Sequence, residues 1–524
     1  MSKVVNSSLV NLALGIALLP ISFPVALYAQ SSSKTSQASL SNAVPPKLTP
    51  EQERGLRLLK TAEVESAGLE PDMHAFVLWR ASYAYTKVDP KNAEKLSRDA
   101  FRATQAIEDA PDNDHCAAMG SAGDMKSWIQ EHTLRDMVHK DRVQEVEQLL
   151  PQATTPARNE ITAELVKYYE SKKDLMHAES LLSQLADSAR YPFGTAANLL
   201  TALGAEHSAD RMSIFNQALN NFEQHATETS FGGDDIGTFI ERTWKDIPSG
   251  LVLEAIGKVL DEAKERGSQS HYSMSSAKGS VVLNSAYALR LFQLLPVLEE
   301  LDKDKAEALL HEQTEVAEQL KTYPKGMQSL NSTSFSYGVT DDKSGIGNAL
   351  PVHGTFESSS PRSDVLLGIA EKTAAKKASV SKSALDEFST IQDQLTPQET
   401  TGIDRLPELY LKIGDVDGAK KAVDILVKAA AKIYEKDTDA DDPNKAFKGT
   451  WPSTDLWRKA IQEGAKISLK LPEEIIAGMQ DVEIAAFEKV AFASDLVGES
   501  ALDAPILVSD CRKNGASYVV SASH

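Results

Sequence analysis

Apolar residues recur at helical spacing along most of this chain, and this periodicity constrains the fold more than any other feature. A clear example is the stretch in which Leu165 and Tyr169 precede a polar break at Ser171–Asp174. Apolar residues then resume at helical spacing from Ala178 to Leu185. A break this short allows only an antiparallel pair of helices. Sustained alternation of β-branched residues is nearly absent, so we predict an all-α chain.

The composition is that of a folded protein with an acidic surface. The chain has 524 residues, a net charge of −20, 42% hydrophobic residues and 6% aromatic residues. This length accommodates either a few ordinary domains or one long solenoid. Because so acidic a surface repels phosphate backbones and anionic lipid headgroups, nucleic acid is a poor candidate partner. The low aromatic content also counts against a sugar-binding cleft.

The N-terminus has the three-part layout of a secretory signal peptide. Lys3 gives a weakly basic start, an apolar run follows at Leu9–Leu19, and Pro20 and Pro24 end it before the small residue Ala29. We predict cleavage after Ala29 and export to the periplasm or the medium; the alternative is an uncleaved anchor, which the two prolines and the short apolar core disfavour. No other run approaches the roughly 20 apolar residues that span a bilayer, so the mature chain is predicted to have no stable membrane span.

Shifts in composition divide the rest of the chain into helical blocks. The segment Thr49-Pro50-Glu51-Gln52 predicts a helix start with a capping box, and Thr155-Pro156 repeats its first half. Two strongly apolar helices are predicted at 284–301 and 303–320. The predicted organisation is a signal peptide at 1–29, a flexible linker at 30–47, an N-terminal helical repeat block at 48–265, a helical hairpin flanked by Ser/Gly-rich loops at 266–364, a C-terminal helical repeat block at 365–498 and a tail at 499–524.

Three segments, at 76–101, 161–185 and 407–423, share one packing rule. An aromatic residue on a first helix precedes small residues on a second helix, so the two helix axes can approach closely. The clearest copy has Tyr410 and Gly414 before the turn and two alanines after it, and a weaker copy has the same kind of pair. The predicted repeat-packing residues are Tyr169, Ala178, Tyr410, Gly414, Ala419 and Ala422.

On these residues the chain resembles tetratricopeptide and related helix-turn-helix repeats of secreted bacterial proteins. The resemblance is partial, because Lys172-Lys173 stand in place of the turn glycine in one copy and the intervening segments do not follow the rule. It implies a superhelix of αα-hairpins, a TPR-like solenoid with a concave binding face and a long Ser/Gly-rich loop. It brings no catalytic residues with it.

Two matches to the Ser-x-x-Lys motif, at Ser275–Lys278 and Ser379–Lys382, are the nearest approach to a nucleophile motif. On a helix that spacing places the lysine beside the serine, as in penicillin-binding folds. Both lie in Ser- and Lys-rich stretches, and the partner motifs of those folds are missing. We therefore interpret both as chance matches and predict no catalytic and no cofactor-binding residues.

Two stretches, one rich in His and one acidic, have spacings that resemble those of metal sites. His132, Asp136 and His139 form one stripe on a predicted helix, but the two histidines stand about 10 Å apart, too far for one ion. The acidic loop at Asp437–Asp442 has the spacing of the first half of a calcium loop, yet Lys448 stands where an EF-hand needs glutamate. A solvated polar stripe and a solvated charge cluster are the favoured interpretations, with a weak calcium site the alternative for the loop. We therefore predict no metal site and no cofactor.

The two cysteines and one long loop each allow two interpretations. Cys116 and Cys511 are the two cysteines of an exported chain and so form a candidate disulfide, although an extended solenoid would hold them too far apart. The long loop at 331–364 carries Phe335, Tyr337, His353 and Phe356 and is either a binding lip or disordered.

These observations favour an exported, non-enzymatic helical-repeat scaffold that binds a protein or peptide in the cell envelope. The alternative from another class is a carbohydrate-active enzyme, a lyase or glycosidase, on an α/α-toroid. Such an enzyme needs paired carboxylates in an aromatic-lined cleft, and sequence alone does not pair them. A weaker third hypothesis is an envelope-stress or assembly factor with no fixed ligand.

Overall fold

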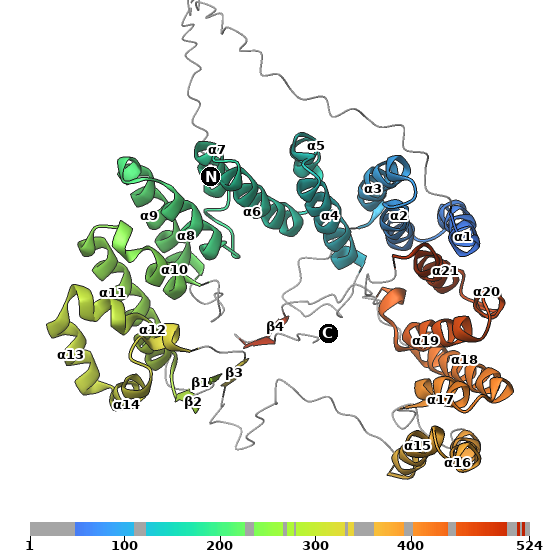
Figure 1. Ribbon diagram of the computed structural model, residues 1–524. Helices are drawn as coiled ribbons and strands as arrows, with labels where there is room; N and C mark the ends of the chain where they lie inside the picture. Colours follow the sequence, from blue (N-terminus) through green and yellow to red (C-terminus); the bar gives the residue numbers. More distant parts are fainter. Residues whose placement is uncertain are drawn as a thin grey trace, which may run out of the picture. The chain divides into compact units, whose positions relative to one another are not determined.

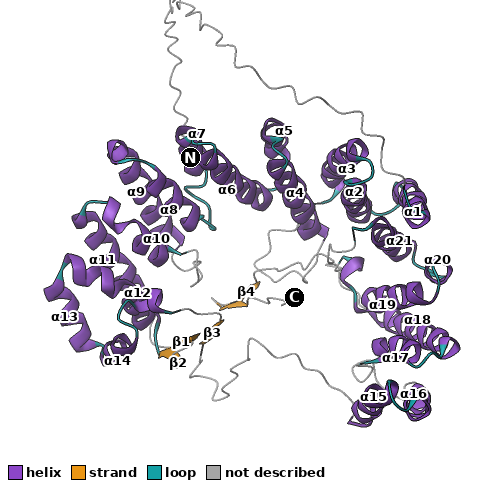
Figure 2. Ribbon diagram, in the orientation of Figure 1, coloured by secondary structure: helices purple, strands orange, loops and turns teal. Residues whose placement is uncertain are grey.

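The computed structural model describes residues 48–108, 122–225, 235–265, 270–276, 279–330, 334–339, 361–391, 402–438, 447–499, 511–513 and 516–518. The predicted signal peptide and linker lie outside the described residues. Almost all of the described chain is helical, which confirms the predicted all-α repeat class (Figure 2).

The N-terminal helices precede a small sheet (Figure 1). They are α1 (Pro50–Ser66), α2 (Pro71–Tyr85), α3 (Pro90–Ala103), α4 (Ala122–His139), α5 (Val143–Leu149), α6 (Thr155–Ser171), α7 (Leu175–Ser183), α8 (Phe193–Ala202), α9 (Ser208–His225), α10 (Ile236–Thr243) and α11 (Ser249–Glu265). The predicted capping box at the start of α1 is confirmed, because Thr49 and Gln52 each bond the other's backbone N–H.

The remaining helices follow the first two strands. They are α12 (Ala286–Leu301), α13 (Lys303–Glu312), α14 (Thr314–Thr322), α15 (Pro361–Ala374), α16 (Ala378–Ile391), α17 (Leu406–Lys412), α18 (Val416–Thr438), α19 (Pro452–Ile467), α20 (Lys470–Ala477) and α21 (Val482–Val497). The second of the two predicted apolar helices is divided into α13 and α14, because Gln313 leaves the helical conformation with φ −120° and ψ 75°. Short 3-10 turns occur at η1 (Thr104–Ala106), η2 (Leu150–Gln152), η3 (Ala205–His207), η4 (Trp244–Asp246), η5 (Gly326–Ser329), η8 (Ile403–Arg405) and η9 (Lys448–Thr450).

Consecutive helices pair as antiparallel hairpins, and the first helices of neighbouring hairpins pack side by side. Helices α2, α4, α6, α8, α10 and α12 contact one another in that order, while α3, α5, α7, α9 and α11 each pair with the helix before them. The same arrangement continues at the C-terminal end, where α19 contacts α21 and α21 contacts α2. The order of packing therefore passes from the C-terminal helices directly into the N-terminal ones (Figure 1).

Helices α2 and α21 lie parallel to each other, although they are far apart in the sequence. At their N-terminal ends the backbone N–H of Glu70 donates to the carboxylate of Glu483 at 3.2 Å. At their C-terminal ends the ammonium group of Lys87 lies 3.4 Å from the carbonyl oxygen of Gly498. Both ends of the pair are thus held together by polar contacts.

The expected Ser/Gly-rich loops around α12–α14 contain strands, which corrects the sequence interpretation. Strands β1 (Ser270–Ser276), β2 (Gly279–Leu283) and β3 (Ser334–Val339) form an antiparallel sheet in the order β2-β1-β3. The alternation that predicts a strand is short in both cases: in β1 Ser273 separates the buried Tyr272 and Met274, and in β2 the half-buried Val282 separates the buried Val281 and Leu283. In the C-terminal tail β4 (Cys511–Lys513) pairs with β5 (Ala516–Tyr518).

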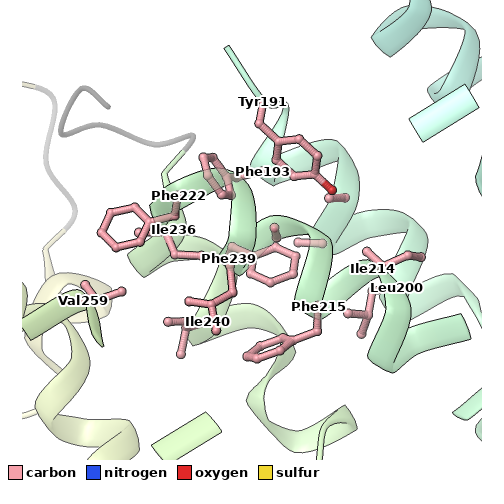
Figure 3. Close-up of a cluster of buried hydrophobic side chains, with 14 of the residues drawn as sticks. Tyr191, Phe193, Leu200, Ile214, Phe215, Phe222, Ile236, Phe239, Ile240 and Val259 are labelled. Atoms are coloured by element: carbon pink, nitrogen blue, oxygen red, sulfur yellow. The ribbon is translucent and has the colours of Figure 1, made fainter. Parts of the chain in front are cut away.

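Buried aliphatic and aromatic side chains hold the hairpins together. Around α8, α9 and α10, for example, Phe239 packs with its ring centroid 5.6 Å from that of Phe215 and 6.3 Å from that of Phe193 (Figure 3). All three are buried, as is Ile240 on the same helix. Burial of an apolar side chain of this size stabilises a fold by about 1.5–3 kcal/mol relative to exposure, so these contacts fix each hairpin against the next.

Candidate functional site: the face shared by α19, α21, α2 and α4

A series of aromatic side chains crosses from α21 to α2 and on to α4. Phe76 of α2 stacks on Phe487 of α21 with ring centroids 4.9 Å apart, and Phe447 lies 5.3 Å from Phe76. Trp79, further along α2, meets Trp128 of α4 edge-on at 4.5 Å. Such pairs add about 0.5–1.5 kcal/mol each beyond the burial of their area. The series therefore fixes three helices against one another at the place where the two ends of the described helical region meet.

The end of this series on α4 is partly exposed. Trp128 and His132 of α4 are half-buried, as is Tyr83 of α2, whose ring centroid lies 5.0 Å from that of the buried Trp79. The imidazole of His132 stacks on the indole of Trp128 at 4.0 Å, and its Nδ1 lies 2.9 Å from the carbonyl oxygen of Trp128. Burial lowers the pKa of His132, so this ring is neutral at physiological pH. Aromatic rings with one exposed edge are typical of a surface that receives another molecule.

A buried carboxyl group lies beside the other end of the series. The Glu488 side chain on α21 is 1% exposed, and one of its oxygens accepts a hydrogen bond from Arg458 of α19 at 3.3 Å. Its Oε2 atom is shielded from solvent and has no hydrogen-bond partner within the described residues. The Arg458 guanidinium also lies over the ring of Phe487, 4.7 Å from its centroid. Burial raises the pKa of Glu488 to about 7, against the opposing effect of Arg458.

Further charges surround Glu488. The negative charges of Asp455 and Asp495 act in the same direction as burial and raise the pKa of Glu488. Burial also raises the pKa of Asp495, while the positive charges of Arg80 and Arg458 lower it. Carboxyl groups with raised pKa values beside guanidinium groups are the kind of cluster that occurs at functional sites. Because Glu488 Oε2 is closed off from solvent, a bound molecule reaches it only if a neighbouring helix moves.

A second ionic cluster joins η9 and α18 to the N-terminal end of α21. The ammonium group of Lys448 lies 2.7 Å from Asp481 Oδ2 and 2.5 Å from Glu483 Oε2. Asp481 caps α21 through the backbone N–H groups of Glu483 and Ile484, and it also accepts a hydrogen bond from Tyr434 at 2.8 Å. These partners hold the pKa of Asp481 below its usual range despite burial. With its lone pairs occupied by protein donors, the cluster acts structurally.

The predicted His–Asp stripe is part of α4 but does not converge. His132 is engaged with Trp128, Asp136 pairs with Lys140 at 2.7 Å, and His139 is exposed. Within the described ranges no three His, Cys, Asp or Glu side chains are placed to hold a metal ion. Of the acidic loop, residues 439–442 lie outside the described residues, while Lys448 belongs to the ionic cluster at α21.

The two Ser-x-x-Lys matches lie in different structures. Ser275 is in strand β1, so the helical spacing that the motif requires does not apply there. Ser379 and Lys382 are both on α16, but the ammonium group of Lys382 contacts Asp415 and lies 3.8 Å from Asp386. Lys382 is therefore occupied by acidic partners rather than by a serine hydroxyl.

Four of the predicted repeat-packing residues are buried, and Gly414 lies at the turn between α17 and α18. Ala178, Ala419 and Ala422 have no exposed surface. Tyr410 is buried and its hydroxyl donates to Asp386 at 2.8 Å, and Gly414 takes the left-handed conformation with φ +77° at the turn.

The other predicted tyrosine and the remaining open positions are distributed elsewhere. Tyr169 is half-buried, stacks on His177 at 3.9 Å and donates to Glu147 at 2.6 Å. Cys116 lies outside the described residues and Cys511 lies in β4, so their disulfide stays a prediction. Of the four residues of the 331–364 loop, for which a binding lip or disorder was expected, Phe335 and Tyr337 fall in β3, while His353 and Phe356 lie outside the described residues.

Sequence reasoning missed the candidate site because its residues are spread over the whole chain. Trp79 and Trp128, on α2 and α4, belong to one buried cluster, and Trp451 and Trp457, just after η9 and on α19, belong to a second cluster that includes Ile484 of α21. A low overall aromatic content thus conceals a local concentration. The tryptophan positions were visible in the sequence, but only the packing of α21 on α2 brings them together.

Comparisons with known proteins add little to this geometry. No family model and no curated protein matches the sequence. A solved structure described as a circular tandem repeat protein with novel repeat topology and enhanced subunit contact surfaces aligns with 86% of this chain and 95% of its own, at 11% sequence identity and a TM-score of 0.14. A TM-score this low does not establish a shared fold. No helix among the described residues combines the length and the apolarity needed to cross a bilayer.

Proposed function

We propose that this chain is an exported, non-enzymatic helical-repeat scaffold, related to the tetratricopeptide type, that binds a protein or peptide in the cell envelope. The observation that carries the proposal is the unbroken packing of first helices from α19 through α21 and α2 to α12. Stacked hairpins of this kind present an extended surface to a partner rather than a closed pocket. The placement of Tyr410, Gly414, Ala419 and Ala422 at hairpin contacts supports the tetratricopeptide relation.

The chemistry of the candidate face favours a basic polypeptide as the partner. Trp128, His132 and Tyr83 offer aromatic edges, and the chain as a whole carries a net charge of −20. On α4 the same face carries Glu131, paired with Arg135 at 2.7 Å. Aromatic anchors beside carboxylates suit arginine and lysine side chains, which stack on aromatic rings and pair with acids.

The test is capture of the partner from a bacterial envelope. The full chain with a C-terminal affinity tag is expressed in a host with a periplasm and cross-linked, and the bound proteins are identified by mass spectrometry. We expect one stoichiometric partner that Trp128→Ala loses and Trp244→Ala retains; Trp244 is also half-buried but lies on η4. Recovery of no partner, or equal loss in both variants, would contradict a binding role for this face.

Export is tested separately on the same preparation. N-terminal sequencing of the recovered protein should begin at Gln30, because we propose cleavage after Ala29. A protein that retains Met1 would contradict the proposed signal peptide without affecting the binding test.

One observation favours a carbohydrate-active enzyme as the second candidate. Glu488, with its pKa of about 7, lies among aromatic rings and two other carboxyl groups, as a general acid of a glycosidase does. Polysaccharide turnover that Glu488→Gln abolishes would establish this activity. We favour the scaffold over this activity because the Oε2 atom of Glu488 is shielded from solvent.

A further inference from the structure

Helix α1 begins the described helical region and α21 ends it, and the two pack against each other like the two helices of a hairpin. Helix α1 packs along α21, while α2 and α3 already pair with each other. The direction is antiparallel, since Gly55 near the start of α1 adjoins Val497 at the end of α21, and Glu65 near the end of α1 pairs with Lys489. Helix α1 thus takes the place that the second helix of a hairpin has elsewhere in the stack (Figure 1).

The helix axes approach closely at Gly55. A Cβ atom at this position would lie 2.9 Å from the carbonyl oxygen of Ala493, 2.9 Å from Val497 Cγ1 and 3.0 Å from Leu496 Cβ. Real Cβ atoms do not approach backbone oxygen so closely, so any side chain here must push α1 away from α21. Gly55 is buried within the second turn of α1, and glycine inside a helix costs about 0.5–1 kcal/mol relative to alanine. The close packing of α1 against α21 offsets this cost.

Ion pairs reinforce this contact on both sides. Arg54 of α1 pairs with Glu473 of α20 at 2.5 Å, and Lys489 of α21 pairs with Glu65 of α1. On the neighbouring helix, Lys87 after α2 lies 2.7 Å from Glu499 after α21. These pairs link residues more than 400 positions apart, so they contribute to joining the C-terminal helices to the N-terminal ones.

We propose that α1 is a latch: its pairing with α21 holds the C-terminal helices on the N-terminal ones, and its release frees α21 and opens the candidate face. Helix α21 belongs to the candidate face and also packs against α1. It presents Phe487 to Phe76 of α2 and Glu488 to Arg458 of α19. Because α21 supplies these contacts, loss of α1 loosens the aromatic series and exposes the shielded carboxyl group. The latch does not depend on the identity of any bound molecule.

The test compares matched glycine substitutions in the full chain. Gly55→Ala and Gly55→Leu place a side chain in the α1–α21 contact, whereas Gly257→Ala and Gly257→Leu place one on α11, where nothing lies within 4 Å. Hydrogen exchange is followed by mass spectrometry. We expect Gly55→Leu to accelerate exchange across both α1 and α21 about tenfold or more, with a smaller acceleration for Gly55→Ala. The Gly257 variants should leave α1 and α21 unchanged.

Faster exchange in α1 alone would overturn the latch. It would show that α1 unfolds locally without destabilising α21. A charge exchange provides the second measurement if Gly55→Leu fails to fold. Lys489→Glu should accelerate exchange in α1 and α21 a few-fold by placing a carboxylate opposite Glu65, and adding Glu65→Lys should restore the original rate. Additive acceleration in the double variant would also overturn the proposal.

Discussion

The pH dependence of stability provides a direct test of the buried carboxyl group on α21. Burial raises the pKa of Glu488 from 4.5 to about 7 in the folded protein, while the unfolded chain exposes it to water. The folded state therefore holds the proton more tightly than the unfolded state. The stabilisation is fully present below pH 4.5, decreases as the pH rises through 7 and is lost above that value.

The size of the effect follows from the same values. One pKa unit corresponds to about 1.4 kcal/mol, so ionisation of Glu488 destabilises the fold by about 3 kcal/mol between pH 4.5 and pH 8. Glutamine has nearly the same shape but does not ionise, so Glu488→Gln should lack this part of the pH dependence. The wild type should thus lose about 3 kcal/mol more than the variant over that range.

The assay is urea unfolding at several pH values, monitored by tryptophan fluorescence. Trp79 and Trp128 contact the helices of the junction, so the signal reports on the region that contains Glu488. Glu94→Gln on the exposed side of α3 serves as the control and should retain the wild-type dependence. Glu241, whose pKa burial also raises to about 7, contributes equally to wild type and variant and cancels in the difference. Parallel pH profiles for wild type and Glu488→Gln would refute the reasoning.

Three further substitutions test α10 and α12, each measured by chemical unfolding at pH 7. Gly237→Ala should cost about 1–3 kcal/mol, because its Cβ would lie 2.0 Å from Gln293 Oε1; unchanged stability would contradict that contact. Arg290→Met should cost about 3–5 kcal/mol by leaving Asp235, 2.6 Å away and almost fully buried, without this cation, and an Asp235→Asn change in the same chain should recover part of the loss. Phe239→Ala should cost about 3–5 kcal/mol, and a loss below 1 kcal/mol would show that its aromatic neighbours close the cavity.

Helical periodicity predicted the fold class because most helices have one buried and one exposed face. On α3, for instance, Ala93, Leu96 and Ala100 are buried at helical spacing while Lys95 faces solvent. The strands escaped prediction for the complementary reason. Where Ser and Gly fill the exposed positions of a strand, as in Ser273 between Tyr272 and Met274, composition resembles that of a loop.

The sequence did not predict the candidate site, because its charged residues are buried whereas charged residues are usually exposed. Glu488 reads as a solvated position in a polar stripe of α21, yet α19 covers it. Arg80 on α2 is likewise a charged residue that is 5% exposed. Neither burial follows from local sequence, since each depends on a helix that is distant in the chain.

The pairing of α1 with α21 explains why charged residues of α2 and α21 are buried. A helix in the interior of a stack needs one apolar face for its hairpin partner and one for each neighbour, so α2 and α21 are buried on nearly every side. The ends of an ordinary solenoid instead need polar capping faces. Because α21 and α2 lie in the interior, they retain apolar surface such as Phe76 and Phe487 at positions where a capping helix would expose charge. Helices α2 and α21 thus lack capping character for the reason that makes α1 a latch: they lie inside the stack and not at an end of it.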